Sequence, residues 1–132
     1  MATQTHTIRQ LCDEFDVTPR TLRFYEAKGL LEPIRQGQRR LFTQRDRARL
    51  ILILRGKRFG FSLAEIKDLL ELYNHDDDHV SQISATLAAA KRHHAELLEK
   101  RRELDEAIAE LEQQMTIGEK MLTDKSIGQV AE

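Results

Sequence analysis

The sequence has few of the residues that build covalent, metal or aromatic ligand sites. Its 132 residues include one cysteine, Cys12, and no tryptophan, and only 5% are aromatic. A single cysteine excludes an internal disulfide framework, and the shortage of rings argues against a large aromatic ligand cage. Because no cysteine follows residue 12, neither a thiolate metal site nor a cysteine-held iron–sulfur cluster can form in the C-terminal part. We therefore predict no metal and no cofactor.

Long apolar runs are also missing. No stretch is long and apolar enough to span a bilayer, and the start MATQTHTIRQ lacks the apolar core of a signal peptide. With 40% apolar and 33% charged residues, the composition is typical of one modest domain with a small core and much solvent-exposed helix. We expect no membrane partner and a cytoplasmic location.

The overall charge of −1 hides a strong asymmetry between the two halves of the chain. Residues 1–60 contain 13 Lys and Arg and 6 Asp and Glu, a net charge of +7. Residues 61–132 contain 8 Lys and Arg and 16 Asp and Glu, a net charge of −8. This distribution predicts a basic module that binds a polyanion and an acidic remainder that does not.

Two short helices joined by a tight turn are predicted near the N-terminus. Thr7 has capping-box spacing to the glutamine three residues later, so a helix begins there and ends near Asp16. Thr18 is suited to cap a second helix with Pro19 at its first position, and Gly29 is placed to end it. This arrangement predicts a helix-turn-helix.

The next segment predicts a small hairpin, or wing, followed by two more helices. In LLEPIRQGQRRLF, residues 30–42, a proline and a glycine exclude a continuing helix and a polar turn lies at 36–38. Thr43 is placed to open a third, strongly apolar helix that ends at Gly60. Ser62 begins a capping box for a fourth helix.

A heptad pattern of apolar residues then runs from Val80 to Met115 and ends near Gly118. Its spacing alternates between three and four residues, with His94 and Arg101 as polar members. A helix this long has no partner within so short a chain, so we expect it to pair with a second copy, although it could fold back on the N-terminal part. The residues predicted to make the dimer are Ile83, Leu87, Ala90, Leu97, Leu104, Ile108 and Leu111.

The second helix carries the residues that point most directly to DNA. In a helix-turn-helix this element enters the major groove. Arg20 and Arg23 share a face, and arginine suits bidentate contact with guanine edges or phosphate. The hydroxyl of Tyr25 can donate to a phosphate, and Thr18 with the free amides of the helix start favours one too. The alternatives are a salt bridge from Arg23 to Glu26 or another acid, and a core position for Tyr25.

Three runs of sequence resemble the MerR family of bacterial transcription regulators, in the family's order. They are TLRFYEAKGLL, GQRRLF and RGKRFGFSLAEI, and the long helix that follows matches the layout of a short form without a separate effector domain. The resemblance implies a mainly α fold, a winged helix-turn-helix head with a long helix that forms an antiparallel coiled coil in a homodimer. It also implies binding to pseudo-palindromic double-stranded promoter DNA, with an indirect effect on RNA polymerase through bending and untwisting of the spacer.

The resemblance adds DNA contacts beyond the second helix. Arg40 corresponds to the family's wing arginine and Arg39 precedes it, while Lys57 and Arg58 lie near a second wing. The family often has tyrosines where this chain has Arg39 and Phe42. We therefore expect the contacts of the wing to be rearranged.

The predicted organisation is a DNA-binding domain over residues 5–74, a linker at 75–79, a dimerisation helix at 80–118 and a short tail at 119–132. The linker contains HDDDH. His75 and His79 would suit a zinc-like ion on a continuous helix, but we interpret the segment as polar, with its acids at a helix N-terminus.

Several functional alternatives remain open at this level. The motif runs are most similar to those of the subgroup associated with branched-chain amino-acid and fatty-acid breakdown. A small-molecule effector would have to bind near the coiled-coil ends. A DNA-architectural or excisionase-like protein could use the same head without sensing, and a coiled-coil adaptor would use no nucleic acid. An enzyme is not expected, because no nucleophile–base set or phosphate-binding glycine loop is found.

Overall fold

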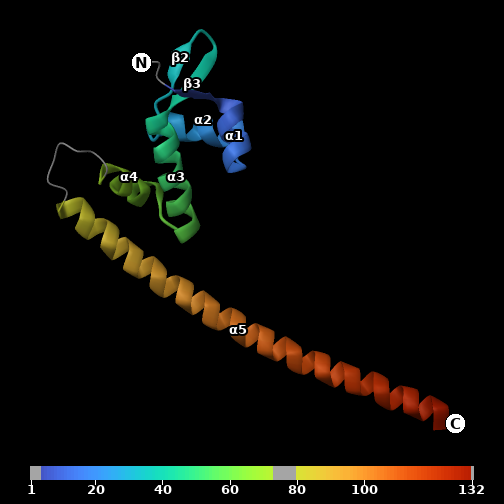
Figure 1. Ribbon diagram of the computed structural model, residues 1–132. Helices are drawn as coiled ribbons and strands as arrows, with labels where there is room; N and C mark the ends of the chain where they lie inside the picture. Colours follow the sequence, from blue (N-terminus) through green and yellow to red (C-terminus); the bar gives the residue numbers. More distant parts are fainter. Residues whose placement is uncertain (1–3, 73–79, 132) are drawn as a thin grey trace. The chain divides into compact units, whose positions relative to one another are not determined.

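The computed structural model describes residues 4–72 and 80–131 (Figure 1). It confirms the predicted class, a mainly helical chain with a small wing sheet and one long C-terminal helix. The chain divides into two compact units, residues 1–93 and residues 94–132. We refer to the first unit as the head.

The head begins with the predicted helix-turn-helix. Helix α1 spans Ile8–Phe15 and helix α2 spans Pro19–Ala27. The side chain of Thr7 and the backbone of the third helical residue form the predicted capping box, and Thr18 caps α2. Asp16 adopts the left-handed conformation with φ of 54°, which ends α1 and turns the chain tightly into α2.

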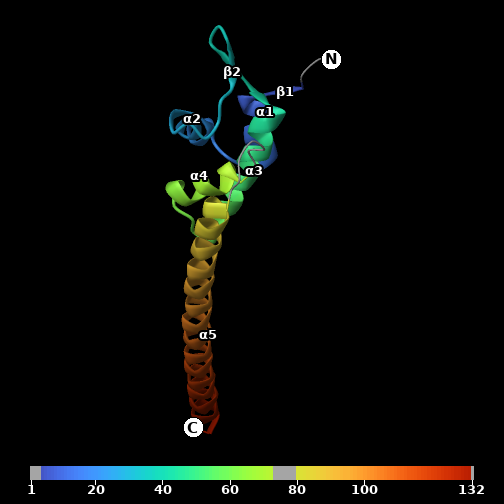
Figure 2. The ribbon, with the colours of Figure 1, turned by 90° about the vertical axis from the view of Figure 1, so that its left-hand side faces the viewer.

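A three-stranded antiparallel sheet lies beside these helices, in the order β1-β3-β2. Strands β2, Ile34–Gln36, and β3, Arg39–Thr43, are the predicted wing, and Gly37 supplies the positive φ of 61° at its turn. Strand β1, Thr5–Thr7, was not predicted, since its three residues form a strand only by pairing with β3. In both ribbon views the β2–β3 hairpin projects from the head (Figure 1 and Figure 2).

Helices α3, Gln44–Phe59, and α4, Leu63–Glu71, complete the packing of the head. Thr43 and Ser62 make the predicted capping boxes, and Gly60 ends α3 with φ of 91°. At the two helix starts, side chains accept from amides that the helix leaves unpaired, and at Gly60 the backbone N–H donates to the carbonyls of Gly56 and Lys57. The local signals therefore fix the boundaries independently of the rest of the fold.

The core of the head lies where α1, α2, α3, α4 and β3 meet. At Gly56, an added Cβ would lie 2.9 Å from Cγ1 of Ile66, so the glycine allows α3 and α4 to approach closely. The largest fully buried side chains are Tyr25, Phe42, Leu11, Leu22, Leu30, Leu31, Leu50, Ile53 and Ile66.

Helix α5 spans Val80–Ala131, and its first turns belong to the head. Ala89 is buried in the core cluster, and the ring of His93 stacks on Phe61 with centroids 5.2 Å apart. The helix does not end near Gly118, so the predicted tail is helical as far as Ala131. Gly118 lacks the positive φ of a helix-ending glycine and costs only about 1 kcal/mol relative to alanine in a helix interior.

Candidate nucleic-acid interface

Helix α2 exposes a basic face that includes an aromatic ring. Arg20 and Arg23 are exposed, as predicted for a face that meets DNA. Phe24 is 45% exposed, and Nζ of Lys28 lies 5.6 Å from its ring centroid. Sequence reasoning missed Phe24, although its position next to Arg23 and its apolar character were visible. Thr18 lies at the start of this face and its hydroxyl oxygen accepts the Thr21 amide, so that oxygen already serves as the helix cap.

Tyr25 does not lie on this face, and the predicted phosphate contact is corrected here. Its side chain is 1% exposed and packs in the core with Leu22 and Leu30. Its hydroxyl is buried and has no hydrogen-bond partner among the described residues. The helical period places Leu22 and Tyr25 on one side of α2 and Arg23 on another. The alternative core position is therefore the one that the structure shows.

The wing is joined to α2 by two ion pairs on one carboxylate. Nη2 of Arg35 and Nε of Arg40 each donate to Glu26, at 2.7 Å to Oε1 and 2.7 Å to Oε2. Burial on its own raises the pKa of Glu26, but the hydrogen bonds and charges of Arg40 and Arg35 outweigh it and hold this pKa below its ordinary value. Glu26 is therefore ionised at neutral pH.

A small hollow lies where α1, α2 and the wing meet. It has a volume of about 290 Å³. Three guanidinium groups contribute to its lining, and guanidinium groups form strong charge-assisted hydrogen bonds with phosphate oxygens. The hollow is therefore suited to a phosphate of a DNA backbone. The lining residues are Thr7, Ile8, Arg23, Gln38, Arg39 and Arg40.

Lys57 and Arg58 are exposed in the last turn of α3, just before the turn at Gly60. The wing leads into the other end of this 16-residue helix, about 24 Å away at the helical rise. The structure thus brings the α2 and wing residues together and places these two separately. Basic side chains at a helix C-terminus also stabilise the helix dipole, which is a second reason for their presence.

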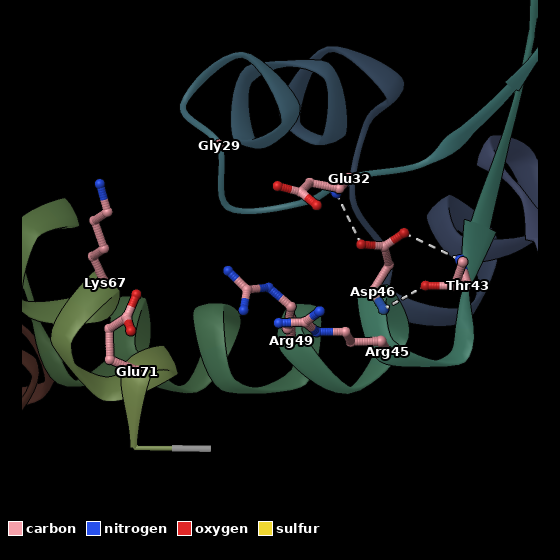
Figure 3. Close-up of a pocket in the computed structure, with 8 residues that line it drawn as sticks. All are labelled: Gly29, Glu32, Thr43, Arg45, Asp46, Arg49, Lys67 and Glu71. Atoms are coloured by element: carbon pink, nitrogen blue, oxygen red, sulfur yellow. Dashed lines mark hydrogen bonds between the residues drawn. The ribbon is translucent and has the colours of Figure 1, made fainter. Parts of the chain in front are cut away.

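A second hollow, of about 360 Å³, lies between α3, α4 and the chain after Gly29 (Figure 3). Its lining holds three basic and three acidic side chains, so its balanced charge does not favour a polyanion. Asp46 is buried and accepts the amides of Glu32, at 2.9 Å, and Thr43, at 3.1 Å. Nε of Arg49 donates to the Leu30 carbonyl at 2.8 Å. These hydrogen bonds hold the chain that follows α2 against α3.

Large apolar side chains of the predicted seam are exposed along α5. Leu97 is 44% exposed and Leu104 is 61% exposed. Ala90 differs, because it is partly buried against the core cluster of its own head. The exposed series extends beyond Met115 to Leu122, which is 70% exposed. The other exposed members of the predicted seam are Ile83, Leu87, Ile108 and Leu111.

Residues 4–72 and 80–131 contain neither a cluster of metal-ligating side chains nor a membrane-spanning helix. In these ranges no group of three or more His, Cys, Asp and Glu side chains could hold a metal ion. His75 and His79 lie outside the described residues. Burial raises the pKa of the Cys12 thiol, as expected for a small core residue. No helix in the same ranges is long and apolar enough to cross a membrane.

Comparison with known proteins identifies the family of the chain. Residues 6–72 match the family described as "MerR HTH family regulatory protein", and residues 47–114 match "MerR, DNA binding". The chain is 32% identical over 109 residues to the HTH-type transcriptional regulator ZntR of Escherichia coli strain K12, which covers 81% of this chain and 71% of ZntR.

Two solved structures are similar in fold. HiNmlR, a MerR family regulator lacking the sensor domain and bound to promoter DNA, matches with a TM-score of 0.62 and 28% identity, over 77% of this chain and 80% of that one. PbrR691 from Ralstonia metallidurans CH34, in complex with lead(II), matches with a TM-score of 0.58 and 30% identity, over 80% and 84%.

These relatives are regulators and not enzymes, and they give no support to the subgroup of branched-chain amino-acid and fatty-acid breakdown. The match over the helix-turn-helix agrees with the exposed basic face of α2 and with the wing beside it. The chain belongs to the MerR family of DNA-binding transcription regulators.

Proposed function

We propose that this chain is a homodimeric, sequence-specific regulator that binds a pseudo-palindromic promoter and controls transcription by distorting the spacer DNA. The observation that carries the proposal is the convergence of α2 and the wing on one basic hollow. The DNA contacts that we propose come from α2, the wing and the end of α3, and Tyr25 is left out because it is buried. They are Thr18, Arg20, Arg23, Arg39, Arg40, Lys57 and Arg58.

Dimerisation is proposed through the exposed seam of α5. Contiguous exposed apolar surface of this length is unusual for a monomer, and a second copy would bury it by knobs-into-holes packing. We assign the interface to residues 80–118 and extend it to Leu122, since the exposed apolar series continues that far. Ala90 contributes less than its heptad position suggests, because its own head already covers part of it.

The charge along α5 favours an antiparallel pair. Residues 80–102 contain five Lys and Arg and two Asp and Glu, a net charge of +3. Residues 103–118 contain five Asp and Glu and no Lys or Arg, a net charge of −5. A parallel pair would align like charges, whereas an antiparallel pair aligns opposite ones. This orientation suits two heads that read two half-sites.

Regulation is proposed to act on the promoter itself, in the cytoplasm, and to reach RNA polymerase through the shape of the DNA. HiNmlR, which lacks the sensor domain, was solved on promoter DNA, and this supports a head and helix that bind without one. A thiolate metal signal is not part of the proposal, since no cysteine follows Cys12. Within the described residues, we propose the ends of the coiled coil as the place for a small-molecule effector.

The test combines binding, mass and transcription measurements on the full chain. Light scattering should give a dimer, and footprinting upstream of the protein's own gene should show two protected half-sites related by a pseudo-two-fold axis. Affinity should fall steeply with salt, and transcription in vitro should change on that promoter. Bending of many unrelated DNA fragments would indicate an architectural protein instead, and absence of salt-dependent DNA binding would indicate an adaptor.

A further inference from the structure

Glu26 occupies an unexpected place for an acidic residue. It lies on α2, between two exposed basic elements, with a side chain that is only 16% exposed. Arg35 and Arg40, its two partners, are directly opposite each other in the β2–β3 register. Two like charges at such a position repel each other, and one carboxylate between them removes most of that repulsion.

The two partners differ in what else they touch. Arg35 is 60% exposed, whereas Arg40 is 24% exposed and also lines the hollow that Arg23 and Arg39 share. Arg40 uses Nε for Glu26. A guanidinium group is planar, so a bond at Nε fixes the plane in which its two Nη nitrogens lie. The carboxylate therefore controls the orientation of the Arg40 donors at the hollow.

We propose that Glu26 is a positioning residue for DNA binding, which holds the wing against the recognition helix and aims Arg40 at a backbone phosphate. The inference rests on the proposed DNA-binding function. Simple electrostatics predicts the opposite effect, since a negative charge on a DNA-binding face repels phosphate. A positioning role strengthens DNA binding where the entropy cost avoided by ordering the Arg40 donors in advance exceeds the repulsion between Glu26 and phosphate.

Two variants, Glu26→Gln and Glu26→Ala, separate positioning from charge. Gln keeps the shape of Glu26 but replaces one of its two acceptor oxygens by an NH2 donor and removes the charge, and Ala removes both bonds. We expect operator affinity to fall about tenfold for Glu26→Ala and somewhat less for Glu26→Gln, within the range of coupling found between contacting residues. The slope of log affinity against log salt should shrink by about one phosphate contact, as it should for Arg40→Ala.

A double variant tests whether Glu26 acts through Arg40. In the Arg40→Ala background, Glu26→Ala should change affinity by about twofold or less, because the guanidinium that it orients is gone. Asp13→Asn is a matched control, since it removes one negative charge from exposed α1. It should leave the salt slope unchanged and affinity unchanged or slightly higher. Thermal melts should show that all variants are folded at the assay temperature.

The outcomes distinguish failure of the proposed DNA-binding function from failure of the positioning role of Glu26. Failure of the parent chain to bind its promoter would overturn the proposed function itself. A parent that binds, together with Glu26 variants that bind equally well or better with an unchanged salt slope, would overturn the positioning role alone. Equal losses from Glu26→Ala with and without Arg40 would also overturn it.

Discussion

The head buries a core of large apolar side chains, whereas the C-terminal part of α5 exposes its large apolar side chains. Among the described residues of the head, nine large side chains are fully buried, and Gly56 lets two helices come into close contact. Between residues 94 and 126, side chains such as Leu104 and Leu122 are 61% and 70% exposed. Among their charged neighbours, Arg102 pairs along the same helix with Glu99 and Glu106.

This contrast shows where each part obtains its stability. The head buries its own core, whereas pairs along one exposed helix contribute only about 0.2–0.5 kcal/mol each. Most helical stability in proteins comes from packing of an apolar face. In the proposed homodimer, the second copy would therefore supply the packing for the C-terminal part of α5, whereas the head buries a core of its own.

The largest expected effect comes from breaking the seam. Leu104→Asp would place an unpaired charge in a buried interface and should destabilise the dimer by about 3 kcal/mol or more per chain. Light scattering should show a monomer, and operator binding should be lost because one head makes half the contacts. Gln113→Asp adds the same charge away from the seam and should leave the dimer intact. A dimeric Leu104→Asp chain would place the interface elsewhere.

The next largest effect should be a loss of stability of the head without a change in dimerisation. Gly56→Val introduces atoms into the 2.9 Å approach to Ile66 and should cost about 1–3 kcal/mol of head stability. Ala48→Val is the control: at an exposed position of the same helix, it measures the loss of stability that comes from the lower helix propensity of valine alone. Denaturant titration should show destabilisation for the first variant only, with the mass of a dimer for both. Equal stability would mean that α4 shifts freely.

Within the head, Arg23 on α2 should affect base preference, whereas Lys57 at the end of α3 should affect only the overall affinity for DNA. Arg23→Ala should cost about 1–3 kcal/mol of operator affinity and relax base preference at one position. Lys57→Ala should weaken binding to all sequences alike and reduce the salt slope by about 1. Gel-shift series on a panel of single-base operator variants measure both. Identical specificity profiles for Arg23→Ala and the parent would remove Arg23 from base recognition.

A smaller effect tests the continuity of α5. Gly118→Ala should stabilise the protein by about 1 kcal/mol, since alanine is the better helix former and the backbone needs no positive φ there. Gly60→Ala is the contrasting variant, because φ of 91° at Gly60 strains any side chain, and it should be destabilising. Thermal unfolding compares the two. Destabilisation by Gly118→Ala would mean that the helix ends there.

The smallest effect is the acid dependence at the junction of α4 and α5. The amide of Ser62 and then the hydrogen bond to His93 lower the pKa of Glu65 from 4.5 to about 2. A carboxyl whose pKa falls on folding contributes stability above pH 4.5, and this contribution is lost as the pH drops from 4.5 towards 2. Glu65→Gln should therefore flatten the stability curve of the parent in that window, as followed by circular dichroism. Parallel curves would refute the assignment.

The sequence predicted the features that depend on near neighbours. Capping boxes at Thr7, Thr43 and Ser62 marked three helix starts correctly, because the interacting groups are three residues apart. Gly60 marked a helix end for the same reason. The long helix also followed from a repeat that is local in the chain, and the pairing of its seam with a second copy stays a prediction.

Features that depend on distant partners were not predictable. Strand β1 exists only through its pairing with β3, more than 30 residues away. Helical spacing groups Tyr25 with Leu22 but does not show what that side of α2 contacts, and tertiary packing places it in the core. The bonds of Glu26 link residues 9 and 14 positions apart, across a loop and a strand. Nothing in the spacing of these charges indicated that one acid would pair with two arginines.

The capping boxes and the buried Asp46 carry a consequence for how the protein responds to ionic strength. Their hydrogen bonds join groups in direct contact, and the residue Asp46 is 3% exposed, so dissolved ions screen them little. Contacts with phosphate are long-ranged and weaken steeply as salt replaces protein around DNA. With the proposed function, a rise in salt would therefore release the promoter long before it unfolded the head, leaving an intact protein that rebinds as soon as the salt is removed.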